Sequence, residues 1–402
     1  MRPYSQDEEE RIRAQALVRE WTRSKLLDPS QGAQLEAELR VGLKRTNVFL
    51  RAGLALFTAL IIGASVLFVV AGLDLDLKRA IPIAIISGVA ALVCIGLAEL
   101  LVARFRFYRF GVEEALAVAS VLLLSISGGV LISTLHIVRP GDVALATGLL
   151  LGAAGGLGIY RRFGFVYAAI GGMACAALIP FQLSFSLAIR HLLAAAFLAS
   201  AFLVVRSKRL RYRDDYPGDD YGLLQAAAWG GLYITLNLQL TGTRIDRFFY
   251  EFTHGMAAWQ NEGFFYWSTY VTTWVLPVVG LRLGIREKDR PLIDINLAMA
   301  LVTLLTNKAY LGRAEHTWDP ILLGVFLMAV ALATRRWLSQ GPDGQRGGFT
   351  PARVLSKDNE ALKLLSAASV RFQPDVPSPR PEPVKSEFDG GRSGGGGATG
   401  SY

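Results

Sequence analysis

Ten apolar runs, each long enough to cross a lipid bilayer, are spread over residues 52–338 of this chain. A hydrocarbon core about 30 Å thick needs about 20 apolar residues in each helix that crosses it. The sequence therefore predicts an all-α, polytopic integral membrane helix bundle of about ten transmembrane helices, with the lipid bilayer as its surroundings. The predicted spans are 52–72, 81–103, 112–135, 143–160, 164–182, 187–205, 221–240, 264–284, 291–311 and 320–338.

Lys and Arg alternate between rich and poor loops. Loops 104–111, 161–163, 206–220 and 282–290 hold fourteen of them, and the opposite loops hold eight. The positive-inside rule places the rich side in the cytoplasm, together with both termini if the number of spans is even. The weakest span is 187–205, because Arg190 and His191 stand at its start. We therefore expect a multi-pass membrane protein with both termini cytoplasmic.

The net charge of +9 does not indicate a nucleic-acid partner. The basic residues flank apolar runs, where they fix topology and meet anionic headgroups. After residue 340 the chain becomes rich in Pro and then in Gly and Ser, a composition that cannot bury enough apolar surface to fold. We expect three parts: a cytoplasmic helical hairpin (1–46), the transmembrane bundle (47–340) and a disordered cytoplasmic tail (341–402).

The first 46 residues predict two short helices. The second begins at residues 28–31, where an acid, a proline at the first helical position and a glutamine form a capping-box-like start. Leu17, Val18 and Trp21 share one face of the first helix. Helices this short must pack on each other, on the bundle or on a partner. A membrane-proximal hairpin and a docking module for a cytoplasmic protein partner both stay open.

Trp21, the apolar pair Leu26–Leu27, the turn at 28–30 and the glutamines Gln31 and Gln34 stand before the many spans. This arrangement resembles the bacterial multi-spanning proteins grouped as domain of unknown function 2157. The resemblance covers the hairpin and the first few spans, about a third of the chain, and Lys25 stands where those proteins often have glycine. It implies an integral protein of a bacterial inner (plasma) membrane and supplies no catalytic residues.

The glycines Gly148, Gly152 and Gly156 form a small-xxx-small stripe in one predicted span. Such a stripe lets helix backbones approach closely. We expect it to pack helices within this bundle rather than to form a dimer face.

All four histidines fall on the predicted outer side: His136, His191, His254 and His316. Imidazoles and neighbouring carboxylates can bind a divalent metal or move protons. No pair shows the spacing of a metal-binding helix, so the four are weak metal candidates, and histidines without a common site are the favoured interpretation. We expect no cofactor.

The outer segment 241–263 mixes charges with large aromatic rings. An interfacial helix anchored at headgroup depth is the favoured interpretation. The alternative is a gate over an outward-facing cavity, with four charged residues as its candidates: Arg244, Asp246, Arg247 and Glu251.

Polar residues inside predicted spans are functional candidates because they are costly in lipid. We single out Glu99, Asn237 and Asp294. Glu99 lies near Arg104 and is expected to pair or to reach the interface, and Gln225, Asn237 and Asn307 are expected to bond between helices. No carboxylate is placed at mid-bilayer.

These patterns favour a non-enzymatic membrane protein with a scaffold, regulatory or envelope-maintenance role. A small-solute transporter or channel is the first alternative, and a mid-depth cavity lined by Glu99, Asn237 or Asp294 would favour it. A membrane enzyme with an outer histidine and acid site is the second, and convergence of three histidines would favour that.

Overall fold

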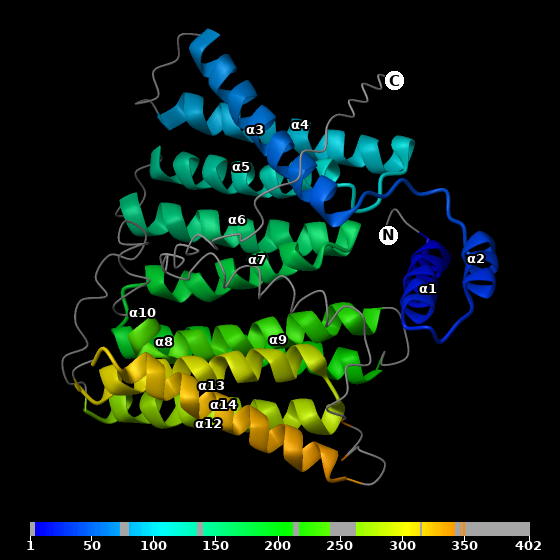
Figure 1. The fold of residues 1–402 in the computed structure, drawn as a ribbon. Helices are drawn as coiled ribbons and strands as arrows, with labels where there is room; N and C mark the ends of the chain where they lie inside the picture. The colour runs from blue at the N-terminus through cyan, green and yellow to red at the C-terminus, as the bar shows by residue number, and fades with distance from the viewer. Residues whose placement is uncertain are drawn as a thin grey trace, which may run out of the picture. The chain divides into compact units, whose positions relative to one another are not determined.

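The computed structural model describes residues 5–72, 80–134, 140–211, 217–241, 263–313 and 316–341, with Arg346 and Phe349. These residues form helices and no strand, which confirms the all-α prediction. The helices, drawn in Figure 1, are α1 (Gln6–Arg23), α2 (Pro29–Glu38), α3 (Val48–Gly72), α4 (Ala80–Phe105), α5 (Val112–Thr134), α6 (Pro140–Phe163), α7 (Val166–Leu178), the 3₁₀ helix η1 (Ile179–Gln182), α8 (Leu187–Arg211), α9 (Pro217–Leu236), α10 (Leu238–Thr241), α12 (Gly263–Glu287), α13 (Arg290–Tyr310) and α14 (Asp319–Ser339).

The expected number of ten spans is wrong. In the described ranges, seven helices are long and apolar enough to cross a membrane, namely α3, α4, α5, α6, α8, α13 and α14. Helix α7 has only 13 residues before the backbone tightens into η1 at Pro180, and α9 and α12 carry too many polar residues. The span expected to be weakest, α8, is among the seven. Because seven such helices in the described ranges are an odd number, the argument that placed both termini on one side no longer holds.

The chain divides into two compact units. The first comprises Met1–Val18 and Pro29–Ala329, and the second comprises Arg19–Asp28 and Val330–Tyr402. In the second unit, the Arg346 guanidinium lies over the Trp337 ring, 4.8 Å from its centroid. These units cut across α1 and α14, and the three parts expected from the sequence stay a prediction.

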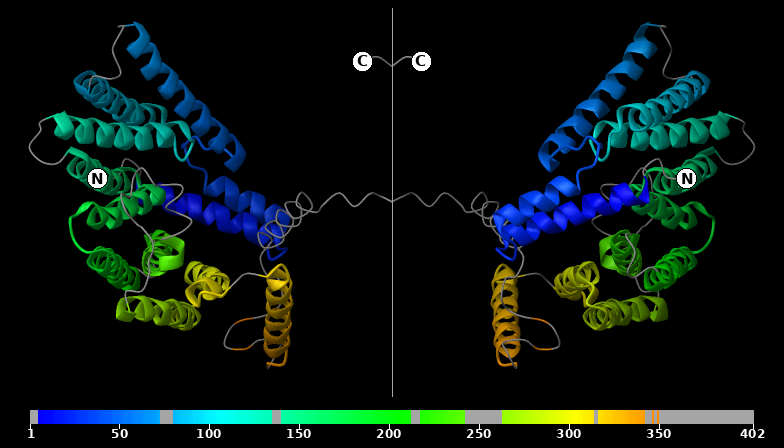
Figure 2. Two further views of the ribbon diagram at one scale, coloured as in Figure 1. Left: turned by 90° about the vertical axis from the view of Figure 1, so that its left-hand side faces the viewer. Right: turned by 90° about the vertical axis from the view of Figure 1, so that its right-hand side faces the viewer.

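Within the first unit, helices that follow one another in sequence pack side by side from α4 to α9. Figure 2 shows several of them nearly end-on. The glycine stripe lies between α6 and its neighbours: a Cβ at Gly156 would lie 2.9 Å from the Gly172 Cα of α7, and one at Gly148 would lie 3.2 Å from the Ser125 carbonyl oxygen of α5. The prediction that the stripe packs helices inside the bundle is confirmed.

One end of this unit carries most of the described ion pairs, and we call it the ion-pair end. The pairs join helix ends that are distant in sequence, so they fix how neighbouring helices align. They are Arg51–Glu114, Arg162–Glu99, Arg206–Glu287, Arg209–Asp289 and Arg106–Glu8.

The hairpin is tied to the bundle at this end. Lys44, after α2, donates its backbone N–H to the Arg106 carbonyl (3.0 Å) and accepts from the Tyr108 N–H (3.1 Å). We call residues 40–47 the tether. The loop between α4 and α5 that receives it contains the stacked rings of Phe107 and Phe110, with centroids 4.3 Å apart. The hairpin therefore packs on the bundle, and Leu17 on α1 stays half-exposed.

Candidate functional site

A line of polar side chains, all buried except the partly buried Thr306, joins α9 to α13. On the α9 side they recur every four residues, which places them on one helix face. We call the following eight residues the polar seam: Gln225, Trp229, Tyr233 and Asn237 from the α9 side, and Asn296, Thr303, Thr306 and Tyr310 from α13. At 1.5 Å per residue, the twelve-residue separation of Gln225 and Asn237 extends about 18 Å along the helix.

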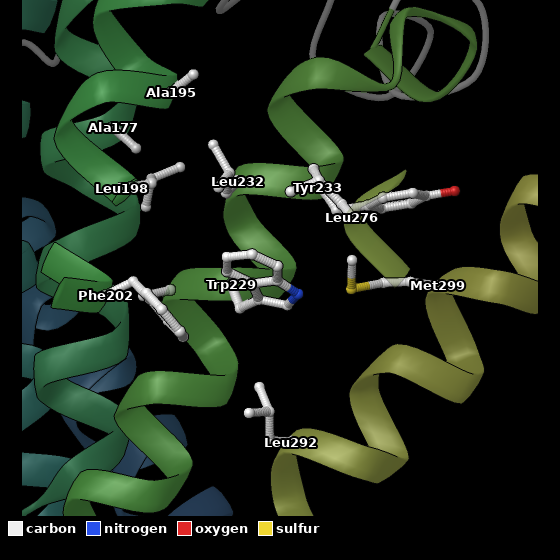
Figure 3. Close-up of a cluster of buried hydrophobic side chains, with 11 residues drawn as sticks. Ala177, Ala195, Leu198, Phe202, Trp229, Leu232, Tyr233, Leu276, Leu292 and Met299 are labelled. Atoms are coloured by element: carbon white, nitrogen blue, oxygen red, sulfur yellow. The ribbon is translucent and has the colours of Figure 1, made fainter. Parts of the chain in front are cut away.

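The middle of the seam lies inside an apolar cluster formed by α7, α8, α9, α12 and α13. Figure 3 shows Trp229 with Phe202 and Leu198 on one side, Met299 on the other and Leu292 below it. The indole N–H of Trp229 donates to Asn296 Oδ1 at 2.9 Å. Gly280 of α12 makes room for this pair, because a Cβ there would lie 2.5 Å from Asn296 Cγ.

The next hydrogen bonds form a chain with one direction. Asn237 Nδ2 donates to Tyr233 Oη (3.0 Å), and Tyr233 Oη lies 2.8 Å from Thr303 Oγ1. Thr303 Oγ1 is within reach of two backbone carbonyls, those of Thr273 (3.0 Å) and Met299 (2.9 Å). Since a carbonyl only accepts, the Thr303 hydroxyl gives its proton to a carbonyl and must accept the proton of Tyr233.

The Thr273 carbonyl needs this donor because of Pro277. A helical carbonyl normally accepts from the N–H four residues later, and proline has no N–H. Pro277 lies inside α12, four residues after Thr273. The Thr303 hydroxyl of α13 supplies the bond that α12 cannot make for itself, which fixes the two helices in register.

Asn237 marks a break between α9 and α10, and the backbone groups around it bond to side chains. The Leu238 N–H donates to Tyr310 Oη (2.7 Å), and the Gln239 N–H donates to Asn237 Oδ1 (3.2 Å). The Thr235 carbonyl, whose usual partner would be Gln239, lies 2.7 Å from His191 Nδ1 of α8. Because a carbonyl only accepts, Nδ1 carries the proton of this imidazole.

Among the seam residues of α9, Gln225 lies nearest the ion-pair end, in a charged cluster. Arg209 of α8 donates to Gln225 Oε1 at 3.2 Å and pairs with Asp289, which precedes α13. Burial raises the pKa of Asp289, and the Arg209 guanidinium opposes that rise. The seam is therefore bounded by charges at one end and by the helix break at the other.

A separate apolar cavity of about 730 Å³ lies along α5, α6 and α7. Its lining includes the three glycines of the stripe together with Tyr167 and Gln182, and none of Glu99, Asn237 and Asp294. The mid-depth cavity that would favour transport is not this one.

The structure separates the three membrane polar candidates. Asn237 is fully buried in the seam. Glu99 accepts two bonds from Arg162, at 2.7 and 2.8 Å, at the ion-pair end, so Arg104 was the wrong partner. Asp294 is largely exposed, 3.8 Å from Arg290. Asn307 accepts from Tyr270 Oη at 2.8 Å, and with Gln225 and Asn237 it confirms the expected bonds between helices.

Two of the four histidines are described. His191 is buried beside α9, whereas His316 is exposed next to Trp318. The described part of the chain contains no group of three His, Cys, Asp or Glu side chains placed to hold a metal. The remaining histidines and the gate candidates lie outside the described residues: His136, His254, Arg244, Asp246, Arg247 and Glu251.

Most residues of the seam were not predicted from the sequence. Trp229 and Tyr233 count as aromatic and apolar, which hides that they share a helix face with Gln225 and Asn237. The four-residue spacing of these side chains was the available signal.

Together, the apolar helices and their buried polar contacts indicate a multi-pass helical membrane protein. No protein-family model, curated protein or solved structure matches the chain.

Proposed function

We propose that this protein has a structural or regulatory role in the membrane and is not itself an enzyme. The observation that supports this is how the seam uses its polar groups. Tyr233 and Asn237 bond to side chains of α13, and Asn296 bonds to Trp229 of α9. Thr303 of α13 bonds to α9 and also to the backbone of α12. In lipid, such bonds between helices hold a bundle together.

A flux assay tests the proposal in proteoliposomes that contain the full chain. For a structural role, Asn237→Leu lowers the thermal stability of the bundle, and vesicles with wild-type protein are no more permeable to urea or glycerol than protein-free vesicles. Saturable uptake of such a solute that Asn237→Leu abolishes, at a temperature where both proteins stay folded in the vesicles, would contradict it.

Transport of a small polar solute is the second candidate, and the helix break favours it. Discontinuous helices near buried polar side chains are how many transporters build their binding sites. The seam side chains are uncharged, so the fitting solute is uncharged and capable of hydrogen bonding. For this candidate, urea or glycerol flux should exceed that of protein-free vesicles, and Thr303→Val should reduce it.

We also propose that the membrane is a bacterial inner membrane and that the ion-pair end, with the N-terminal hairpin, faces the cytoplasm. The basic loops at this end support the orientation. Topology reporters fused to each terminus test this orientation, and an external N-terminus would overturn it. We further propose that the protein belongs to the group named domain of unknown function 2157 and that the half-exposed face of α1 binds a protein partner.

A further inference from the structure

Glu113, in the first turn of α5, is a carboxylate whose hydrogen bonds are incomplete. Its side chain is fully buried. Oε1 accepts the Phe110 N–H at 2.6 Å, which caps the helix. Oε2 is buried too, and no described residue supplies it with a hydrogen-bond donor.

The nearby cation is already engaged by another acid. Arg51 of α3 donates to both oxygens of Glu114, with Nε 2.7 Å from Oε2. The charged and titratable groups that face Glu113 are Arg51, Glu114 and Tyr167 of α7. An ionised Glu113 would add a second negative charge beside a single guanidinium.

We infer that Glu113 binds a proton at neutral pH and so forms a buried proton site at the ion-pair end. Burying a carboxylate without enough donors is so costly that the group takes up a proton instead. The acid form keeps Oε1 as the acceptor for Phe110 and leaves one neutral hydroxyl, instead of a charge, without a partner.

This site is connected to the hairpin tether through Phe110. The Phe110 carbonyl accepts from Thr46 Oγ1 at 3.3 Å, so the residue that Glu113 caps also holds the tether. Gly111 follows with φ +108°, and a Cβ on it would collide with the Arg51 carbonyl oxygen, so only glycine fits there. Loss of the proton places a charge under this turn, and we expect the tether to loosen. The inference is independent of the role proposed above.

Infrared spectroscopy of the full chain in liposomes tests the proton site. We expect a carboxylic-acid C=O band at pH 7 that shifts in D₂O, is absent in Glu113→Gln and is retained in the matched control Glu99→Gln. Glu99 lies at the same end, but it is paired with Arg162. A missing band, or a band that persists in Glu113→Gln, overturns the proton site.

Trypsin cleavage after Lys44 and Arg45 tests the link to the tether. As pH rises, cleavage in the wild type should increase over the range in which the acid band disappears, and cleavage in Glu113→Gln should stay flat. An equal rise in both proteins overturns the link. A band that persists at every pH, with flat cleavage, supports the proton site and likewise overturns the link.

Discussion

Replacing Gly280 with alanine tests the packing of the seam most directly. The added methyl group would occupy the space of the Trp229–Asn296 pair, since the new Cβ would lie 2.5 Å from Asn296 Cγ. Real Cβ contacts of this kind are not shorter than 3.0 Å. The Trp229 indole nitrogen would lie closer still to the new Cβ. Either both side chains change their rotamers or α12 moves away from α9 and α13.

The expected cost combines two effects. Overpacking a well-packed interior costs about 1–3 kcal/mol. Loss of the Trp229–Asn296 hydrogen bond adds about 0.6 kcal/mol and at most about 1.7 kcal/mol in a membrane bundle. Alanine is intrinsically the better helix former by about 1 kcal/mol, which offsets part of this cost. Gly280→Ala should therefore lower the free energy of unfolding by about 1–4 kcal/mol.

The measurement is reversible unfolding in mixed micelles, followed by circular dichroism. Gly158→Ala on α6 is the matched control, because a Cβ there meets nothing within 4 Å. In an Asn296→Ala background, Gly280→Ala should cost less, because one of the two side chains that obstruct the new Cβ is gone and only the Trp229 indole remains. Equal stability of the two glycine variants would refute the reasoning, as would an undiminished cost in that background.

Three further predictions concern other contacts. Thr303→Val should lower the free energy of unfolding by about 1 kcal/mol. The loss should be smaller in a Pro277→Ala background, where the Thr273 carbonyl again has the N–H of residue 277 as its donor. Equal losses in the two backgrounds of this double-mutant cycle would contradict the argument that this bond fixes the register of α12 and α13. Burial raises the pKa of Asp289, so the contribution of this carboxyl to stability is full below its unfolded pKa of 3.8 and is lost as pH rises through its folded pKa. The stability of the wild type relative to Asp289→Asn should therefore fall as pH rises above about 4. A difference that does not change with pH would contradict this. Glu99→Gln breaks a half-exposed ion pair, so it should change unfolding by less than about 1 kcal/mol, and a larger loss means that the pair is more buried than the structure shows.

The sequence predicted the helices well, because long apolar runs and the start of α2 at Pro29 are local signals. It did not predict the partners within the seam. Trp229 and Asn296 are 67 residues apart, and the need of the Thr273 carbonyl appears only once α13 is placed beside Pro277. The number of spans was wrong for a related reason: α9 gains polar residues that face α13 rather than lipid.

Glu113 shows the same limit at the ion-pair end. Its place in the first turn of α5 was visible in the sequence, and taken alone a helix N-terminus favours an ionised carboxylate there. Its complete burial depends on the loop at 106–111 and on Arg51, which no local pattern connects. The candidate gate at 241–263 lies outside the described residues and stays a prediction.

The seam also determines the order in which the bundle can assemble during biosynthesis. Asn237 and Thr306 bond across 69 residues of chain. At 5–20 residues per second, the ribosome makes the second partner roughly 3–14 s after the first. During that interval the polar face of α9 has no α13 to bond, so α9 must wait in the insertion machinery or at the membrane surface. Final assembly of this part of the bundle is thus tied to the emergence of α13.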